Sequence, residues 1–381
     1  MAALASVAVV AAACSSSGGS TGGSSSSGGA SSSSSAGGSA SAGVATAKAT
    51  MAKYLAAQPA IDIPALPAKP ASGRSLTMIA CGLPACQAPA QAAQAAAKAL
   101  GWHYTELTTP LTPEGYIATF TQAIQGKPNF LIFEGLFPNS TVQTQLQSAK
   151  SAGIKVVGIS ASSAPDSLML ANYSGSSEYI SSGKLQANIV VADSNGKADT
   201  LYVRDPSLDS IFGPELAAYK STLASLCPSC HNTDLAISTA NVGRTVPGQI
   251  VSALQQHSDI KYVVIPVDDD LAGVYAALAS AGMADTVKLI GQTPNKQSLA
   301  AIRAGQEFAS VGDENGTAGW RAVDGLARLD AGISIGDTAP SGWTQIFTKD
   351  NAPSDSDLSA QGTPKVPGDP DAFLSAWHVS S

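Results

Sequence analysis

Short apolar runs alternate with stretches of helical character along most of this chain. FLIFEG at 130–135 and YVVIPV at 262–267 are apolar without alternation, which is typical of strands covered on both faces. The predicted strands are 76–80, 102–107, 129–134, 155–160 and 167–172, followed by 200–204, 233–238, 262–267, 287–291 and 307–311. Helices are predicted between them, for example at 88–100, 113–125, 142–152 and 271–281. The alternation indicates an α/β fold with parallel sheets, and two sets of about five strands predict two lobes.

The first 43 residues depart from this pattern. Small and apolar residues from Ala2 to Ala13 lead into Cys14, and residues 15–43 are only Ser, Gly, Ala and Thr. The apolar run has the length of a signal-peptide core and is too short to cross a bilayer as a helix. The Ser/Gly stretch has nothing to bury, so residues 15–50 are predicted to form a disordered tether.

The end of the apolar run carries a possible lipid-attachment site. Its residues AAAC at 11–14 resemble the lipobox of bacterial lipoproteins, in which the cysteine becomes the lipidated N-terminus. Two departures are Ala11, where that pattern usually has Leu, and the lack of Lys or Arg before Lys48. The resemblance implies that residues 1–14 are an export signal and that Cys14 is lipidated. The alternative is a disordered N-terminus with one stray cysteine.

Composition limits the partners and the number of domains. The body after the tether has about 330 residues, which is more than one core usually serves and favours two domains. A formal charge of -7 and a pI near 5.0 argue against nucleic acid and against an anionic membrane face. After Cys14 no segment approaches 18 uninterrupted apolar residues.

Several phrases of the body share an order and a spacing with one known family. They are AIQG at 123–126 before the FLIFEG strand, SAKSAGIKVV at 148–157, DDDLAGVYAAL at 268–278, LIGQT at 289–293 with IRAG at 302–305, and NGTAGWRAVD at 315–324. Together they resemble the type I periplasmic sugar-binding proteins, the ribose-binding-like solute receptors of ABC importers. The resemblance covers roughly residues 75–377.

This resemblance implies two Rossmann-like lobes joined by three crossings, with a ligand held between them. We expect no cofactor and no metal. The crossings are expected near 172–174, 312–314 and 340–343. The N-terminal lobe would then comprise 75–172 with 314–342, and the C-terminal lobe 173–313 with 343–378. In open α/β sheets ligands lie beyond the carboxyl ends of the strands, which locates the site independently.

The loops after the strands therefore supply the candidate ligand-binding residues. Glu134 and Asp268 end buried strands, and each carboxylate can accept two hydroxyl hydrogen bonds; for Asp268 a helix N-cap is an equal alternative. Asp313 is expected to contact the ligand or to stabilise the hinge. Phe212 is preferred as the aromatic face for a sugar ring. The full set is Glu134, Phe137, Asn139, Ser160, Ser162, Asp205, Phe212, Asp268, Gln292 and Asp313.

Other positions depart from the family pattern. Gln292 and Thr293 stand where sugar-binding relatives tend to have an aromatic residue and an Asp. Glu215 replaces an Arg that many relatives carry near the start of a helix, and 161–162 reads Ala-Ser in place of Asp-Arg. The ligand therefore need not resemble ribose.

Beyond Cys14 the cysteines form two close pairs, Cys81 with Cys86 and Cys227 with Cys230. An even number in an exported chain favours disulfides, and local pairing is the simplest of three connectivities. A Cys81 to Cys86 bridge would stiffen a loop at the mouth of the cleft. Two alternatives stay open, because CPSCH at 227–231 matches a haem-attachment pattern and four cysteines can hold zinc.

The sequence shows none of the common catalytic motifs. It has no G-x-S-x-G, no H-E-x-x-H and no phosphate loop, and none of its four histidines has an obvious partner. We therefore predict no enzyme but a lipid-anchored solute-binding protein on the outer face of a bacterial membrane, delivering a sugar or polyol to an ABC permease. The alternatives are a sensor of the same fold and a cell-wall carbohydrate hydrolase. A cytoplasmic repressor is excluded by the leader and by the lack of a helix-turn-helix.

Overall fold

The computed structural model describes residues 35–335 and 342–379. The predicted export signal, the lipidated Cys14 and the first part of the tether lie outside these residues. Within them, no helix combines the length and the apolar character needed to span a bilayer.

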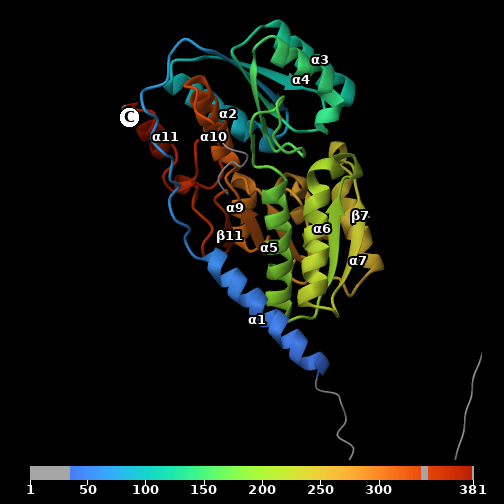
Figure 1. Ribbon diagram of the computed structural model, residues 1–381. Helices are drawn as coiled ribbons and strands as arrows, with labels where there is room; N and C mark the ends of the chain where they lie inside the picture. The colour runs from blue at the N-terminus through green and yellow to red at the C-terminus, as the bar shows by residue number, and fades with distance from the viewer. Residues whose placement is uncertain (1–34, 336–341, 380–381) are drawn as a thin grey trace, which may run out of the picture.

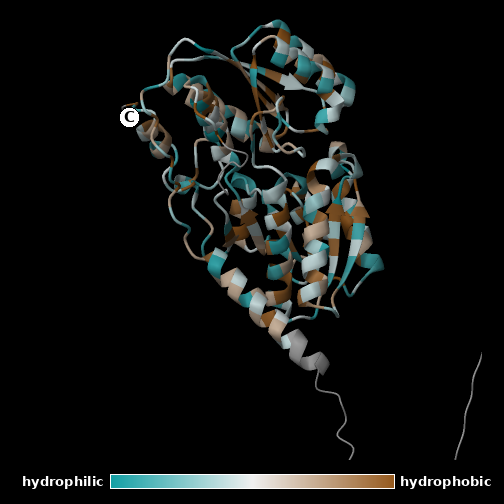
Figure 2. Ribbon diagram, viewed as in Figure 1, coloured by the Kyte–Doolittle hydropathy of each residue, from teal (hydrophilic) through white to brown (hydrophobic). Residues whose placement is uncertain are grey.

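The first lobe is built on a five-stranded parallel sheet of order β2-β1-β3-β4-β5. Its strands are β1 Ser75–Cys81, β2 His103–Thr109, β3 Phe130–Glu134, β4 Lys155–Ile159 and β5 Asn172–Tyr173. Helices α2 Pro84–Ala99 and α10 Asn315–Asp330 pack in the core on one face, and α3 Pro113–Gln125 and α4 Gln143–Ser151 in the core on the other. Figure 2 shows the apolar strands between these helix layers.

The second lobe holds a six-stranded sheet of order β11-β10-β9-β8-β6-β7. Its strands are β6 Asp199–Arg204, β7 His231–Ala236, β8 Tyr262–Val264, β9 Lys288–Gln292, β10 Ala309–Gly312 and β11 Gln345–Thr348. All neighbours are parallel except β11, which pairs antiparallel with β10. The α-helices of this lobe are α5 Ser176–Ser194, α6 Asp209–Leu226, α7 Val246–Gln256, α8 Val274–Ser280 and α9 Lys296–Ala304. Two α/β lobes with mostly parallel sheets are thus confirmed.

Short 3-10 helices follow several strands and carry residues toward the cleft. They are η1 Asn139–Val142, η2 Pro206–Leu208, η3 Thr239–Asn241, η4 Asp268–Leu271 and η5 Asp355–Asp357. The helix predicted at 271–281 is divided, because Gly273 has a φ of 81° and separates η4 from α8. The strand predicted at 167–172 shrinks to β5, because Asp166 accepts hydrogen bonds from the backbone of Leu168 and Met169 and holds a turn there.

Helix α1 Ser35–Leu55 corrects the predicted tether, since residues 35–50 are helical. It packs along α5 and α6 of the second lobe, as Figure 1 shows. Ala47 is fully buried there. A Cβ placed on Gly43 would lie 2.0 Å from the carbonyl oxygen of Leu226, so the small residues that indicated disorder are the ones that permit this close approach.

The chain passes between the lobes more often than predicted. Two passages lie where expected, between β5 and α5 and between β10 and α10. The third connects α10 to β11, and the expected crossing at 340–343 lies partly outside the described residues. Two further segments also pass between the lobes. Segment 56–74 joins α1 to β1, and segment 349–370 joins β11 to the last helix, α11 Asp371–Ala376.

Helix α11 belongs to the core of the first lobe, so the assignment of the whole of 343–378 to the second lobe was wrong. Phe373 and Trp377 stack on Trp320 of α10, with ring centroids 5.9 and 5.6 Å away. The two extra passages also run together, because the Ile61 N–H donates to the Pro367 carbonyl at 2.9 Å. Figure 1 shows both along one side of the molecule.

Candidate functional site

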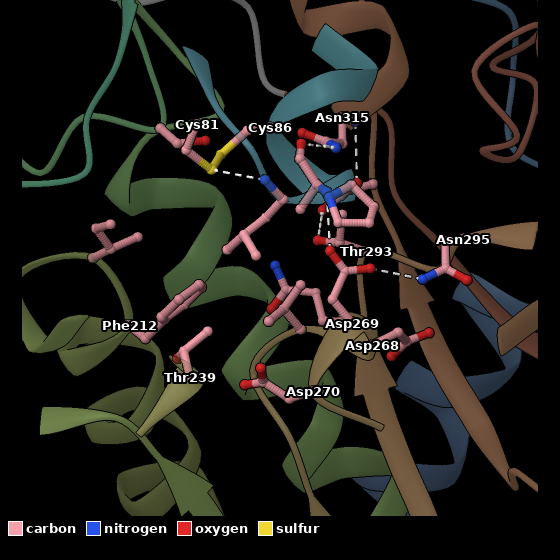
Figure 3. A pocket seen from close by; sticks show the side chains of 18 of the residues that line it. Cys81, Cys86, Phe212, Thr239, Asp268, Asp269, Asp270, Thr293, Asn295 and Asn315 are labelled. Carbon is pink, nitrogen blue, oxygen red and sulfur yellow. Dashed lines mark hydrogen bonds between the residues drawn. A yellow bond between two sulfur atoms is a disulfide. The ribbon is translucent and has the colours of Figure 1, made fainter. Parts of the chain in front are cut away.

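A cavity of about 590 Å³ lies between the lobes. Its walls come from the residues after β1, β3 and β4 in the first lobe and after β6, β8, β9 and β10 in the second, together with the start of α5. These are the carboxyl ends of parallel strands, where the strand pattern placed the site. Figure 3 shows the cavity with the side chains that line it.

Six of the ten predicted ligand-binding residues line this cavity: Glu134, Ser160, Phe212, Asp268, Gln292 and Asp313. The other four, Phe137, Asn139, Ser162 and Asp205, are not part of its lining. Each of the four has a structural role nearby.

Phe137 and Asn139 belong to the core side of the loop after β3. The Phe137 ring packs on Tyr116, with centroids 5.4 Å apart. Asn139 is 8% exposed and its amide nitrogen lies 3.6 Å from the Met169 sulfur. The prediction missed this because a strand-end loop has an inner and an outer side that the sequence does not distinguish.

Ser162 and Asp205 stabilise the loops that follow β4 and β6. The Ser162 carbonyl accepts from the Ser176 hydroxyl at 3.3 Å. Asp205 accepts from the backbone N–H of Ser207 at 2.9 Å and of Thr239 at 2.7 Å. Burial alone would raise the pKa of Asp205, but these hydrogen bonds outweigh it and lower the pKa. Asp205 therefore serves as a cap, the turn-forming role that short polar side chains often take.

Three consecutive carboxylates of η4 form one wall of the cavity, and each has different surroundings. Asp268 is 3% exposed and accepts from the Ser310 hydroxyl at 2.9 Å. A Cβ on Gly291 would lie 1.6 Å from its Oδ1, so only glycine fits beside it. Burial raises the pKa of Asp268 to about 7.

Asp269 connects the lobes, whereas Asp270 has a free oxygen. Asp269 accepts from the Ala85 N–H of the first lobe at 2.9 Å and from the Asn295 amide at 2.8 Å. Asp270 is 4% exposed, and within the described residues its Oδ1 has no hydrogen-bond partner. In Figure 3 Asp269 is directed toward Asn295, while Asp270 lies on the side of Thr239 and Phe212.

Asp313 and Gln292 are held by neighbours at the second crossing. The Thr293 hydroxyl donates to Asp313 at 2.6 Å, and the Asn315 N–H donates to it at 3.1 Å. With its amide nitrogen turned toward Glu215, Gln292 donates to both carboxylate oxygens, at 2.8 and 3.0 Å. Asp313 thus orders the hinge and lines the cavity, and its contact with a ligand stays a prediction.

Glu134 lies beside a disulfide. Cys81 and Cys86 are bonded to each other, as are Cys227 and Cys230. This is the local pairing, whereas haem attachment and a zinc site would both need reduced thiol groups. Glu134 is 5% exposed, and burial, followed by repulsion from Glu106, holds its pKa well above the usual range.

The remaining wall is largely apolar. Phe212 packs edge-to-face on Tyr179, with centroids 5.3 Å apart. Other apolar lining residues come from both lobes: Leu83, Leu136, Leu208, Ile211, Val242 and Leu271. A ligand with both apolar and polar faces therefore matches the site.

Sequence reasoning missed several lining residues. Asp270 is the third residue of the DDD run at 268–270, from which only Asp268 was chosen as a candidate. Glu178 and Tyr179 come from α5, a helix for which no bounds were predicted, and burial raises the pKa of Glu178 to about 7. The acidic run at 268–270 was the one signal in the sequence for the wall that η4 forms.

Three polar lining residues, Ser160, Ser174 and Thr293, have positive φ values of 55°, 51° and 54°. Residues other than glycine rarely adopt this conformation, and such strain is concentrated at functional sites. Ser160 and Thr293 occupy matching places, directly after β4 and β9.

Comparisons with solved structures find the same fold. An ABC transporter solute-binding protein from Agrobacterium vitis with bound allitol shares 19% identity, covers 73% of this chain and 96% of its own, and has a TM-score of 0.65. GanP, a glucose-galactose binding protein from Geobacillus stearothermophilus, shares 16%, covers 74% and 100%, and has a TM-score of 0.65.

A third structure, an ABC transporter solute-binding protein from Mycobacterium smegmatis with bound glycerol, shares 19%, covers 77% of this chain and 100% of its own, with a TM-score of 0.64. No curated protein matches the sequence. The family model of the periplasmic binding protein domain matches residues 77–332. The chain belongs to this family.

Proposed function

We propose that this member of the periplasmic binding protein family is an extracytoplasmic solute receptor. It captures a small polar solute, such as a sugar or a related polyol, between its two lobes and delivers it to the permease of an ABC importer. The observation that carries the proposal is the cavity at the carboxyl ends of both parallel sheets, with polar side chains contributed by each lobe.

Contacts between the lobes support closure around a solute. Ala85 of the first lobe donates its N–H to Asp269 of the second, and its carbonyl accepts from the Asn315 amide at 2.9 Å. Opening the lobes would break the contact with Asp269. A solute that contacts both walls favours the closed form by its differential affinity, and the closed surface is what a permease would recognise.

The N-terminal segment supports a membrane anchor. A lipid on Cys14 would attach the protein to the membrane, and α1 leaves the second lobe on the side remote from the first (Figure 1). An anchor at that end leaves the cavity between the lobes accessible. Replacing Cys14 with Ser should move the protein from the membrane fraction into the medium.

The direct test combines solute release with scattering. Solutes set free by denaturing freshly purified protein are weighed by mass spectrometry and then added back to refolded protein. A sugar or polyol should raise the melting temperature by several degrees at a hundredfold excess over its Kd and should reduce the radius of gyration. Scattering that never changes, together with turnover of a glycoside, would replace the receptor with the hydrolase.

A further inference from the structure

The cavity is rich in acidic residues, and they have almost no basic partners. Seven of its lining residues are acidic and one, Lys296, is basic. The Lys296 side chain is 67% exposed and pairs with Asp355 at 3.2 Å, away from the acidic wall. Among the seven acids only Glu314 forms an ion pair within the described residues, with Arg321 at 2.6 Å.

Three of these carboxylates, Glu134, Asp268 and Asp270, are buried and lack a partner for one oxygen, and Asp268 differs in that its other oxygen accepts from Ser310. Glu134 in the first lobe is 5% exposed and Asp270 in the second is 4% exposed. Within the described part of the chain, Glu134 Oε1 and Asp270 Oδ1 accept no hydrogen bond. A buried carboxylate without a partner is costly, so native proteins normally pair it.

The surroundings of Asp270 add repulsion instead of compensation. Burial, with repulsion from Asp269 and Asp205, raises its pKa to about 7. Nor does the rest of the cavity supply an unpaired cation, since its one basic lining residue, Lys296, pairs with Asp355. A cationic group from outside the chain would pair with these carboxyls and favour their ionised form.

The size and lining of the cavity argue against a metal ion as that charge. Three ligand atoms come within metal-binding spacing at one place in the described residues, at Cys81, Cys86 and Glu134, and the two sulfurs there are joined to each other. A volume of about 590 Å³ with an apolar wall suits an organic molecule. The paired rings of Phe212 and Tyr179 can also attract a cation.

We propose that the solute of this cavity is an organic cation, whose ammonium or similar groups pair with the carboxylates of Asp270 and Glu134 while its carbon skeleton contacts the wall around Phe212. This rests on the proposed receptor function and specifies the class of solute. A polyol that carries an amine would fit both the proposed receptor function and this inference.

The test uses the full chain and a metabolite extract divided by ion exchange into cationic, neutral and anionic fractions. The cationic fraction should raise the melting temperature, and the active solute is then purified from it. Asp270→Asn and Glu134→Gln should each weaken its binding about tenfold or more, because a charge-assisted hydrogen bond is lost. Asp285→Asn, which alters an exposed carboxylate outside the cavity, is the matched control and should bind normally.

The outcomes separate this inference from the receptor function. Stabilisation by the neutral or anionic fraction would overturn the organic cation and leave the receptor intact. Stabilisation by calcium or magnesium chloride alone, lost in Asp270→Asn, would also overturn it. If no fraction and no salt stabilises the protein, both proposals fail. The fraction assay uses the unaltered chain, so it decides the question even if a variant does not fold.

Discussion

The two ends of the second lobe's sheet differ in how they treat charge. At the amino end, Asp193 accepts from both the Tyr262 hydroxyl and the Lys288 ammonium, each at 2.6 Å. At the carboxyl end, Asp270 is buried with an unpartnered oxygen and like charges around it. One sheet therefore has a paired carboxylate, Asp193, at its amino end and an unpaired one, Asp270, at its carboxyl end.

This difference shows which end serves stability and which serves binding. Near the amino end, Gly43 of α1 lies against Leu226 at the end of α6, and the Cys227–Cys230 disulfide follows, with the Cys227 sulfur 3.2 Å from the Gly196 carbonyl. The carboxyl end keeps strained backbone at Thr293. Sites adapted for ligands often retain such destabilising features. Changes at the two ends should accordingly have opposite consequences.

The largest effect is expected from Gly43→Val in α1. Its Cβ would meet the Leu226 carbonyl at 2.0 Å, so α1 must move away, and we expect a loss of about 3 kcal/mol in the free energy of unfolding. Urea unfolding measures it, with solute affinity unchanged. Gly248→Ala in α7, where a Cβ has open space, is the control and should be neutral or stabilising. An unchanged midpoint in Gly43→Val would show that α1 contributes little.

Removing the two disulfides in turn should change the free energy of unfolding by similar amounts but the solute affinity by different amounts. Replacing either cysteine pair with serines should cost about 2 kcal/mol, since both loops are short. Only the loss of Cys81–Cys86 should weaken the solute, because its loop includes Ala85, which contacts Asp269. Calorimetric titration of both variants checks this. Equal affinities would mean that the loop is ordered without its bridge.

Neutralising one carboxylate at each end should change stability in opposite directions. At pH 8 Asp270→Asn should stabilise the solute-free protein by roughly 2 kcal/mol, because it removes a buried charge whose pKa is about 7. Asp193→Asn should destabilise by about 1 kcal/mol, because it weakens two hydrogen bonds at a partly exposed site. Chemical denaturation gives both values, and the same sign for both would contradict the comparison.

The smallest expected effect is the pH dependence of the difference in unfolding free energy between wild type and Asp270→Asn. The folded pKa of Asp270 exceeds its unfolded value near 4, so the native state holds the proton more tightly and the stabilisation is lost as pH rises through 7. From pH 6 to 7.5 the stability gap between wild type and Asp270→Asn should widen by about 1 kcal/mol. Unfolding curves at the two pH values measure it; a constant gap would mean that Asp270 is ionised throughout.

Much of the architecture was predictable because it follows from local pattern. The helix 113–125 agrees with α3 residue for residue, and β1, β3, β4 and β6 lie within one or two residues of their predicted bounds. A continuous apolar run is either a strand of a covered parallel sheet or a buried helix. Glycines that end a helix just before such a run favour the strand. Proximity in sequence likewise made local pairing of the cysteines the simplest choice.

The predictions failed where distant segments decide the outcome. Strand β11 has only four residues and forms by pairing antiparallel with β10. The Ser/Gly/Ala segment is helical where α5 and α6 lie beside it. Asp205 and Asp268 look alike as strand-end acids, yet Asp205 caps a loop and Asp268 lines the cavity.

The sequence by itself determined the two lobes, the order of their elements and the edge of each sheet that meets a ligand, because these depend on periodicity and on the direction of parallel strands. Tertiary structure alone decided which of the strand-end side chains face the cavity and which carboxylates are left without a partner. That decision depends on burial and on neighbours from the opposite lobe, and neither is encoded within a few residues of the position itself.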